Sequence, residues 1–144
     1  MKTGTRRSAL VWIAIAILSG ASGCNQGTPK IQFGKVQGIL RVNGRPQPNV
    51  QVTFNPDKEK GIGLPAYAAA VTDDSGNYSL KYSYLNKTGE GAPVGWNRVT
   101  LVDLSGGKSP GSSAIPTAYT NPTMTPFLFE VKAGDNKIDL DVKK

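Results

Sequence analysis

Histidine is absent from this sequence of 144 residues, and cysteine occurs once, as Cys24. Without histidine, neither a Ser-His-Asp nor a Cys-His nucleophilic site can be assembled, and the usual ligand sets of zinc and other transition metals are missing. A single cysteine also excludes an internal disulfide. These absences predict a chain that is not an enzyme and holds no metal and no cofactor, with a pair of carboxylates as the remaining route to catalysis.

Long apolar runs are scarce as well, and the clearest one covers only residues 9–18. Because about 20 apolar residues are needed to cross a bilayer, this run is too short for a permanent span. Basic residues precede the run, and small residues follow it up to Gly23. This arrangement is typical of a secretory signal peptide, so we expect residues 1–23 to direct export.

The four residues that end this segment, Ala-Ser-Gly-Cys at 21–24, resemble the lipobox of bacterial lipoproteins. In that motif a peptidase cuts before a cysteine that carries a diacylglyceryl group. The resemblance implies that Cys24 becomes an acylated N-terminus and the membrane anchor, since two or more acyl chains suffice for stable anchoring. Acylation would also remove a lone exported thiol that invites intermolecular pairing. The alternative is an ordinary signal peptide followed by an unmodified cysteine.

The charge balance changes once residues 1–23 are set aside. They hold three of the 17 basic residues and no acidic ones, which leaves 14 basic against 10 acidic residues, a net charge of +4. The remaining basic residues are scattered, whereas nucleic-acid binding needs them clustered on one face. We therefore expect a membrane as partner, reached through acylated Cys24, with a possible envelope protein or glycan partner and no nucleic acid.

Residues 24–34 are polar, and we expect them to form the lipidated cysteine and a flexible tether. Beyond them, apolar residues recur with a period of two, which indicates half-buried strands. The alternating segments are residues 36–42, 50–54, 67–71, 78–82, 99–101, 127–131 and 138–142. Glycine and proline occur at nearly every junction, and no segment has a helical period. The pattern predicts an all-β protein, a single antiparallel β-sandwich of about seven strands over residues 35–144.

Two details of this pattern concern the middle of the chain. Three tyrosines, Tyr67, Tyr78 and Tyr82, take inward positions in the expected strands. The segment TDDSGNY between them predicts a tight hairpin, in which Asp73 caps the turn and Gly76 adopts a positive φ.

Four motifs together resemble the carboxypeptidase-regulatory-like domains and the small bacterial lipoproteins built on them. They are VQGILRVNGRPQPNVQVTFNP, TDDSGNYSL, GAPVGWNRVTL and the final stretch IPTAYTNPTMTPFLFEVKAGDNKIDLDV, and the resemblance covers residues 35–142. The resemblance implies a transthyretin-like or Ig-like sandwich. In carboxypeptidases this domain is an accessory to the catalytic one, so the resemblance implies no activity of its own, and a fold does not by itself give a function.

The acidic residues are explained without a catalytic or calcium site. Asp73 and Asp74 belong to the expected hairpin, and Asp139 and Asp141 alternate with apolar residues of the last strand. A calcium site usually needs six or more oxygens and a distant bidentate acid, whereas a turn needs only Asp and Gly.

A different alternative is a self-crosslinked stalk domain. The stretch GEGAPVGW resembles part of the collagen-adhesin B-type domains, in which an acid assists an isopeptide bond between Lys and Asn, and this places Glu90 in the acid's position. The nucleophilic lysine should point inward from the first strand, but that strand offers only Arg41, with Lys35 just before it.

Two aromatic residues remain as possible contact residues, Trp96 at a strand start and Tyr119 in the long segment 105–126. For Tyr119 we favour a docking pin on the core edge over a ligand contact.

The sequence as a whole predicts an exported lipoprotein of the bacterial cell envelope, anchored to the inner or outer membrane, that serves as a non-catalytic binding or structural module. A self-crosslinked adhesin-type stalk and a glycan-binding or glycan-active protein are the alternatives.

Overall fold

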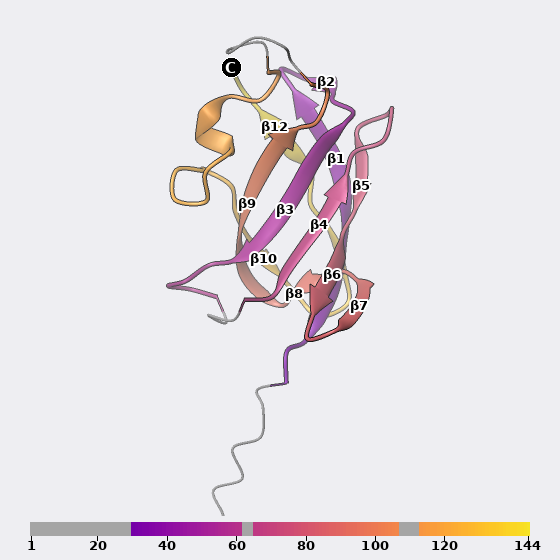
Figure 1. Cartoon of the computed structure of the whole chain (residues 1–144), viewed down its shortest axis with the longest axis vertical. Helices are drawn as coiled ribbons and strands as arrows, with labels where there is room; N and C mark the ends of the chain where they lie inside the picture. The colour runs from indigo at the N-terminus through magenta and orange to yellow at the C-terminus, as the bar shows by residue number, and fades with distance from the viewer. Residues whose placement is uncertain (1–29, 62–64, 107–112) are drawn as a thin grey trace, which may run out of the picture.

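The computed structural model describes residues 30–61, 65–106 and 113–144, which form two β-sheets packed face to face (Figure 1). The predicted signal peptide and Cys24 lie outside the described residues. No helix in the described part of the chain is long and apolar enough to cross a membrane. The all-β sandwich predicted from the sequence is confirmed, although the described residues form more strands than the seven expected.

One of the two six-stranded sheets is antiparallel throughout. Its strands follow the order β10-β9-β3-β4-β6-β7, and their bounds are β10 (Leu128–Val131), β9 (Gly95–Asp103), β3 (Val50–Pro56), β4 (Tyr67–Val71), β6 (Lys81–Tyr84) and β7 (Lys87–Glu90). Val52 of β3 lies opposite Leu101 of β9, and both are fully buried. The alternation of apolar residues along these two strands therefore forms the inner face as predicted.

The other sheet is organised around β1 (Phe33–Val42). Three short strands pair with it antiparallel, namely β2 (Arg45–Pro46), β5 (Asn77–Ser79) and β8 (Ala92–Pro93). Two strands from the end of the described chain, β11 (Asp135–Lys137) and β12 (Leu140–Val142), pair with the opposite edge of β1 in parallel. This sheet is therefore mixed, and the first strand is its centre.

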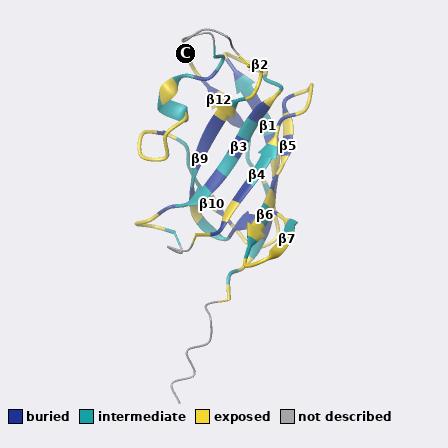
Figure 2. Ribbon diagram, in the orientation of Figure 1, coloured by how far each residue is buried: buried dark blue, intermediate teal, exposed yellow. Residues whose placement is uncertain are grey.

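The core lies between the two sheets, where Figure 2 shows buried residues running along the strands and exposed residues at the turns. Leu40, Phe54 and Leu80 are among its largest side chains and are fully buried. Tyr78 is buried as predicted, and Tyr82 packs against the core.

The inward position predicted for Tyr67 is wrong, because its side chain is 52% exposed. The inner face of β4 is formed by Ala68 and Ala70 instead. Thr72 explains this register: its buried hydroxyl donates to the Gln47 carbonyl and accepts from the Val50 N–H, which turns the even-numbered residues inward. A shift of one residue moves every side chain of a strand to the other face.

The turn after β4 has the predicted geometry. The Asp73 carboxylate accepts hydrogen bonds from the Ser75 and Asn77 N–H groups, and Gly76 has φ of +75°. The following strand β5 nevertheless joins the β1 sheet, and β4 pairs with β6. The turn was predicted correctly but connects two sheets, so it does not close a hairpin.

Candidate functional site

β11 and β12 both pair in parallel with β1, but this ladder is interrupted between them at residues 138–139. Two side chains bridge the gap. The Tyr78 hydroxyl donates to the Ile138 carbonyl at 2.5 Å, and the Asp139 carboxylate accepts from the Ile39 N–H at 3.1 Å. The Tyr78 ring crosses Gly38, its cross-strand partner, and a Cβ at Gly38 would overlap the Ile138 carbonyl. Glycine is therefore required where the tyrosine crosses.

Burial raises the pKa of the Tyr78 hydroxyl well above its ordinary value, and the nearby Asp139 charge raises it further. The neutral hydroxyl is thus held as a hydrogen-bond donor. Tyr78 acts as a structural pin that joins three neighbouring strand segments.

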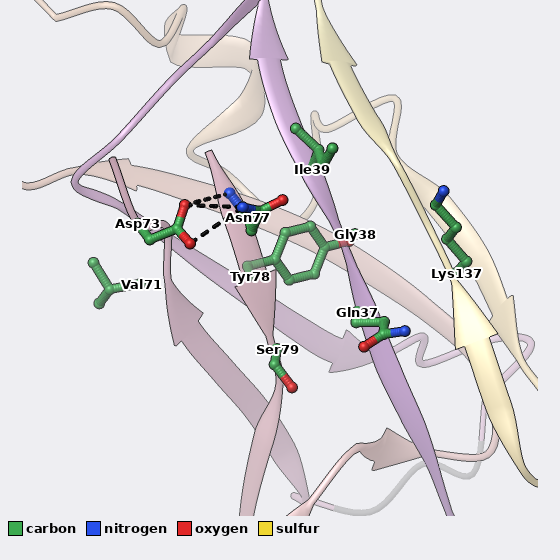
Figure 3. A pocket seen from close by; sticks show the side chains of 9 residues that line it. All are labelled: Gln37, Gly38, Ile39, Val71, Asp73, Asn77, Tyr78, Ser79 and Lys137. Carbon is green, nitrogen blue, oxygen red and sulfur yellow. Dashed lines mark hydrogen bonds between the residues drawn. The ribbon is translucent and has the colours of Figure 1, made fainter. Parts of the chain in front are cut away.

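An open hollow of about 540 Å³, which we name the outer hollow, lies beside this pin (Figure 3). Its lining residues come from β1, β5, β11, the end of β4 and the turn after it: Gln37, Gly38, Ile39, Val71, Asp73, Asn77, Tyr78, Ser79 and Lys137. Gln37 lies opposite both Ser79 and Lys137, so an amide, a hydroxyl and an ammonium group form one exposed row across three strands. These groups can hydrogen-bond a polar ligand.

A second polar cluster surrounds Asp57, which is only 3% exposed. Its carboxylate accepts hydrogen bonds from the Glu59 and Lys60 N–H groups at 3.0 and 2.7 Å and from Arg98 Nε at 2.5 Å. The Lys60 N–H and then the Arg98 side chain hold the pKa of this carboxyl below its ordinary value, against the opposing effect of burial. A carboxylate with these donors is already satisfied, so it fits a structural role better than a general base.

Trp96 belongs to the surroundings of this cluster. Its carbonyl accepts from the Asp57 N–H, and the Lys60 ammonium lies 5.7 Å from its ring centroid. The indole is 37% exposed, so it remains available for contact.

Tyr119 lies elsewhere, on the short 3-10 helix η1 (Thr117–Tyr119). Its ring centroid is 4.9 Å from that of Phe127, which in turn lies 5.8 Å from Phe129. The side chain is half-buried against the core. This position agrees with a docking pin, and the structure does not unite Tyr119 with Trp96 in one cluster.

The segment that contains Tyr119 is tied at its base by Asp103. This carboxylate accepts from the Ser105 N–H at 2.9 Å, the Ala114 N–H at 2.9 Å and the Ser113 hydroxyl at 3.1 Å. Burial alone would raise the pKa of Asp103, but these hydrogen bonds lower it on balance. One side chain therefore holds residues 105 and 113–114 together.

The residues considered for a crosslink are near one another but face solvent. The Lys35 ammonium lies 3.4 Å from the Glu90 carboxylate, and the two side chains are 66% and 65% exposed. The Asn136 amide donates a hydrogen bond to the Lys35 carbonyl at 3.0 Å. The lysine thus lacks the inward position that the crosslink requires.

Asp139, just before β12, and Asp141 within it are also engaged. Arg41 pairs with Asp139 at 3.6 Å and with Asp141 at 3.7 Å across the edge of β1. In the described ranges, no group of three or more His, Cys, Asp or Glu side chains is placed to hold a metal ion.

Sequence reasoning did not find the Asp57–Arg98 pair or the outer hollow. Asp57 is followed by a turn and Gly61, and this was a signal for a capping aspartate. The sequence near Asp57 gives no indication of its pairing with Arg98, 41 positions away.

Comparison of the chain with protein-family models, with curated proteins and with solved structures found no match.

Proposed function

We propose that this protein is a bacterial envelope lipoprotein, anchored through acylated Cys24, whose single β-sandwich is a non-catalytic binding or structural module. The observation that carries the proposal is the position of Cys24. It follows an apolar run too short to span a bilayer and lies nine residues before Phe33, where the folded domain begins. The chain thus passes from a lipobox-like motif into a domain with only a short polar connection.

The outer hollow supports a binding role. Gln37, Ser79 and Lys137 present hydrogen-bonding groups in one exposed row, with Ile39 and Val71 beside them. This mixture suits a glycan or an extended polar segment of an envelope protein.

The three acids that are buried or half-buried in the described residues all have partners, which favours binding over glycan hydrolysis. Asp57 and Asp103 are occupied by hydrogen bonds from the backbone, and Asp139 is occupied by Ile39 and Arg41. A glycosidase needs one carboxylate free to protonate a leaving group. The exposed Lys35–Glu90 pair likewise favours a binding module over a self-crosslinked stalk.

The anchor is tested by replacing Cys24 with serine in living cells. We expect unprocessed precursor to accumulate and labelling by a radioactive fatty acid to disappear. A serine variant that labels and fractionates like the wild type would refute the lipoprotein assignment.

The binding role is tested with a photo-crosslinking residue at Gln37, compared with the same residue at Lys143. Both positions are exposed, but only Gln37 lies in the outer hollow. We expect crosslinked products in the envelope that depend on position 37. Identical products from both positions would refute the assignment of this surface.

A further inference from the structure

An exposed leucine occupies a strained position at the tip of the β6–β7 hairpin. Leu85 and Asn86 connect these strands with φ of 45° and 61°, the backbone of a two-residue type I′ turn. Such turns favour Asn and Gly, because most side chains are strained at positive φ. Leu85 is also 68% exposed, more than any other large hydrophobic residue in the described ranges. The tip therefore presents an apolar side chain where local stability favours a polar residue.

This tip lies at the end of the sandwich where β1 begins, the lower end in Figure 1. The Phe33 ring, at the start of β1, stacks on Tyr82 of the same hairpin with centroids 3.6 Å apart. On its other side, Gln32 accepts a hydrogen bond from the Val94 N–H in the β8–β9 connection, at 2.9 Å. The described chain thus starts between the hairpin that carries Leu85 and the turn that leads to Trp96.

The composition of the lower end matches a lipid surface. Tyr67 and Trp96, which are 52% and 37% exposed, are the first residue of β4 and the second residue of β9, at this end of the sandwich. Lys87 is the cross-strand partner of Tyr84 beside the tip, and Lys60 lies over the Trp96 ring. Tyrosine and tryptophan favour the membrane interface, and lysines are attracted to anionic headgroups.

The length of chain before the domain limits how far this end can be from an anchor. Nine residues separate Cys24 from Phe33, and fully extended they span at most about 30 Å. The opposite end of the sandwich is one further strand length away. An acylated Cys24 therefore keeps the lower end close to the bilayer.

We infer that the lower end of the sandwich rests on an anionic lipid bilayer, with Leu85 inserted among the headgroups and Lys87 and Lys60 against lipid phosphates. This inference rests on the acylation of Cys24 in the proposed function. It adds a fixed orientation to the anchor, because acylation of Cys24 does not by itself specify which end of the domain faces the bilayer.

The test uses the full lipoprotein, purified with its lipid and reconstituted into vesicles of phosphatidylcholine and phosphatidylglycerol with nitroxide-labelled acyl chains. A fluorophore is attached to Thr88→Cys, which keeps Leu85 in place, or to Ser75→Cys at the opposite end. Both native residues are exposed. We expect severalfold stronger quenching at position 88 than at 75. Part of the difference should disappear in 1 M salt, where charges are screened within about 3 Å.

Matched variants distinguish the effect of Leu85 on quenching from the effect of an exposed leucine elsewhere on the domain. Leu85→Asn in the Thr88→Cys background suits the type I′ turn and should lower the quenching towards that at position 75. Leu104→Asn removes another exposed leucine, at the far end of β9, and should leave the quenching unchanged.

The outcomes distinguish the two proposals. If unaltered protein reacts with the fluorophore at Cys24 and does not float with vesicles, the anchor itself is refuted. If it floats and does not react, but positions 75 and 88 are quenched equally, only the orientation is refuted. If isolated peptidoglycan protects the fluorophore at position 88 and vesicles do not, the lower end binds the cell wall. That result would also overturn the inference.

Discussion

Replacing Tyr78 with phenylalanine tests whether a side chain completes the interrupted ladder of the β1 sheet. The change removes only the hydroxyl that donates to the Ile138 carbonyl and leaves the ring over Gly38. A neutral hydrogen bond contributes about 1 kcal/mol, and an unsatisfied buried acceptor costs about 1 to 3 kcal/mol. We expect the free energy of unfolding to fall by about 1 to 2 kcal/mol. For a domain of this size that lowers Tm by about 4 to 10 °C.

The measurement is thermal and urea unfolding of the purified protein, with Tyr67→Phe as the matched control. Tyr67 is 52% exposed, so losing its hydroxyl should change stability by no more than about 0.5 kcal/mol. If both variants melt like the wild type, the Tyr78 hydroxyl does not hold the end of the chain on β1, and the account of the gap at Ile138 is refuted.

The pH dependence of the free energy of unfolding provides a second test of the same hydrogen bond. The pKa of Tyr78 is raised in the folded protein, so the folded state holds this proton more tightly than the unfolded chain does. The contribution of the protonated Tyr78 hydroxyl to the free energy of unfolding is complete below the ordinary pKa of 10.0. This contribution is lost as the pH rises above that value. The stability difference between wild type and Tyr78→Phe should therefore shrink in alkaline solution. A difference that grows with pH would contradict the assignment.

Three other substitutions have defined outcomes. Gly38→Ala forces a methyl group against the Ile138 carbonyl, so we expect a loss of more than about 2 kcal/mol in urea unfolding; a mild effect would show that the strands can move apart. Asp103→Asn should make the segment it ties more sensitive to protease at pH 7. Because the pKa of Asp103 is lowered on folding, its stability difference from wild type should close as the pH falls below the ordinary value of 3.8. Tyr119→Ala should lower Tm by removing the ring packed on Phe127, and an unchanged Tm combined with lost partner capture would make Tyr119 a binding residue.

The sequence was most informative where large apolar residues carried the pattern. Val50, Val52 and Phe54 alternate with polar residues, and all three are fully buried. The pattern failed in β4, where Ala68 and Ala70 form the inner face beside a more conspicuous Tyr67. Alanine is a weak hydrophobic signal, and the register depended on Thr72, whose bonding partners lie in another strand.

The candidate site was less predictable because its groups are brought together by strand pairing. Gln37, Ser79 and Lys137 are about 40 and 60 residues apart in sequence and become neighbours only through β1. Trp96 and Tyr119 could be identified as partly exposed aromatics, but their partners Lys60 and Phe127 could not. Periodicity describes one strand at a time and does not specify which strands meet.

The parallel pairing of β1 with β11 and β12 determines when the domain can fold during synthesis. The sheet around β1 needs residues 135–142, which are made about 100 residues after β1 itself begins. At about 5 to 20 residues per second, a nascent chain stays without these partners for about 5 to 20 seconds. During that interval one edge of the central strand is open, and contacts between such distant segments also make folding intrinsically slow. A chain with this topology stays incompletely folded until β12 emerges, and this unfinished state is the one that the proposed export through a membrane would require.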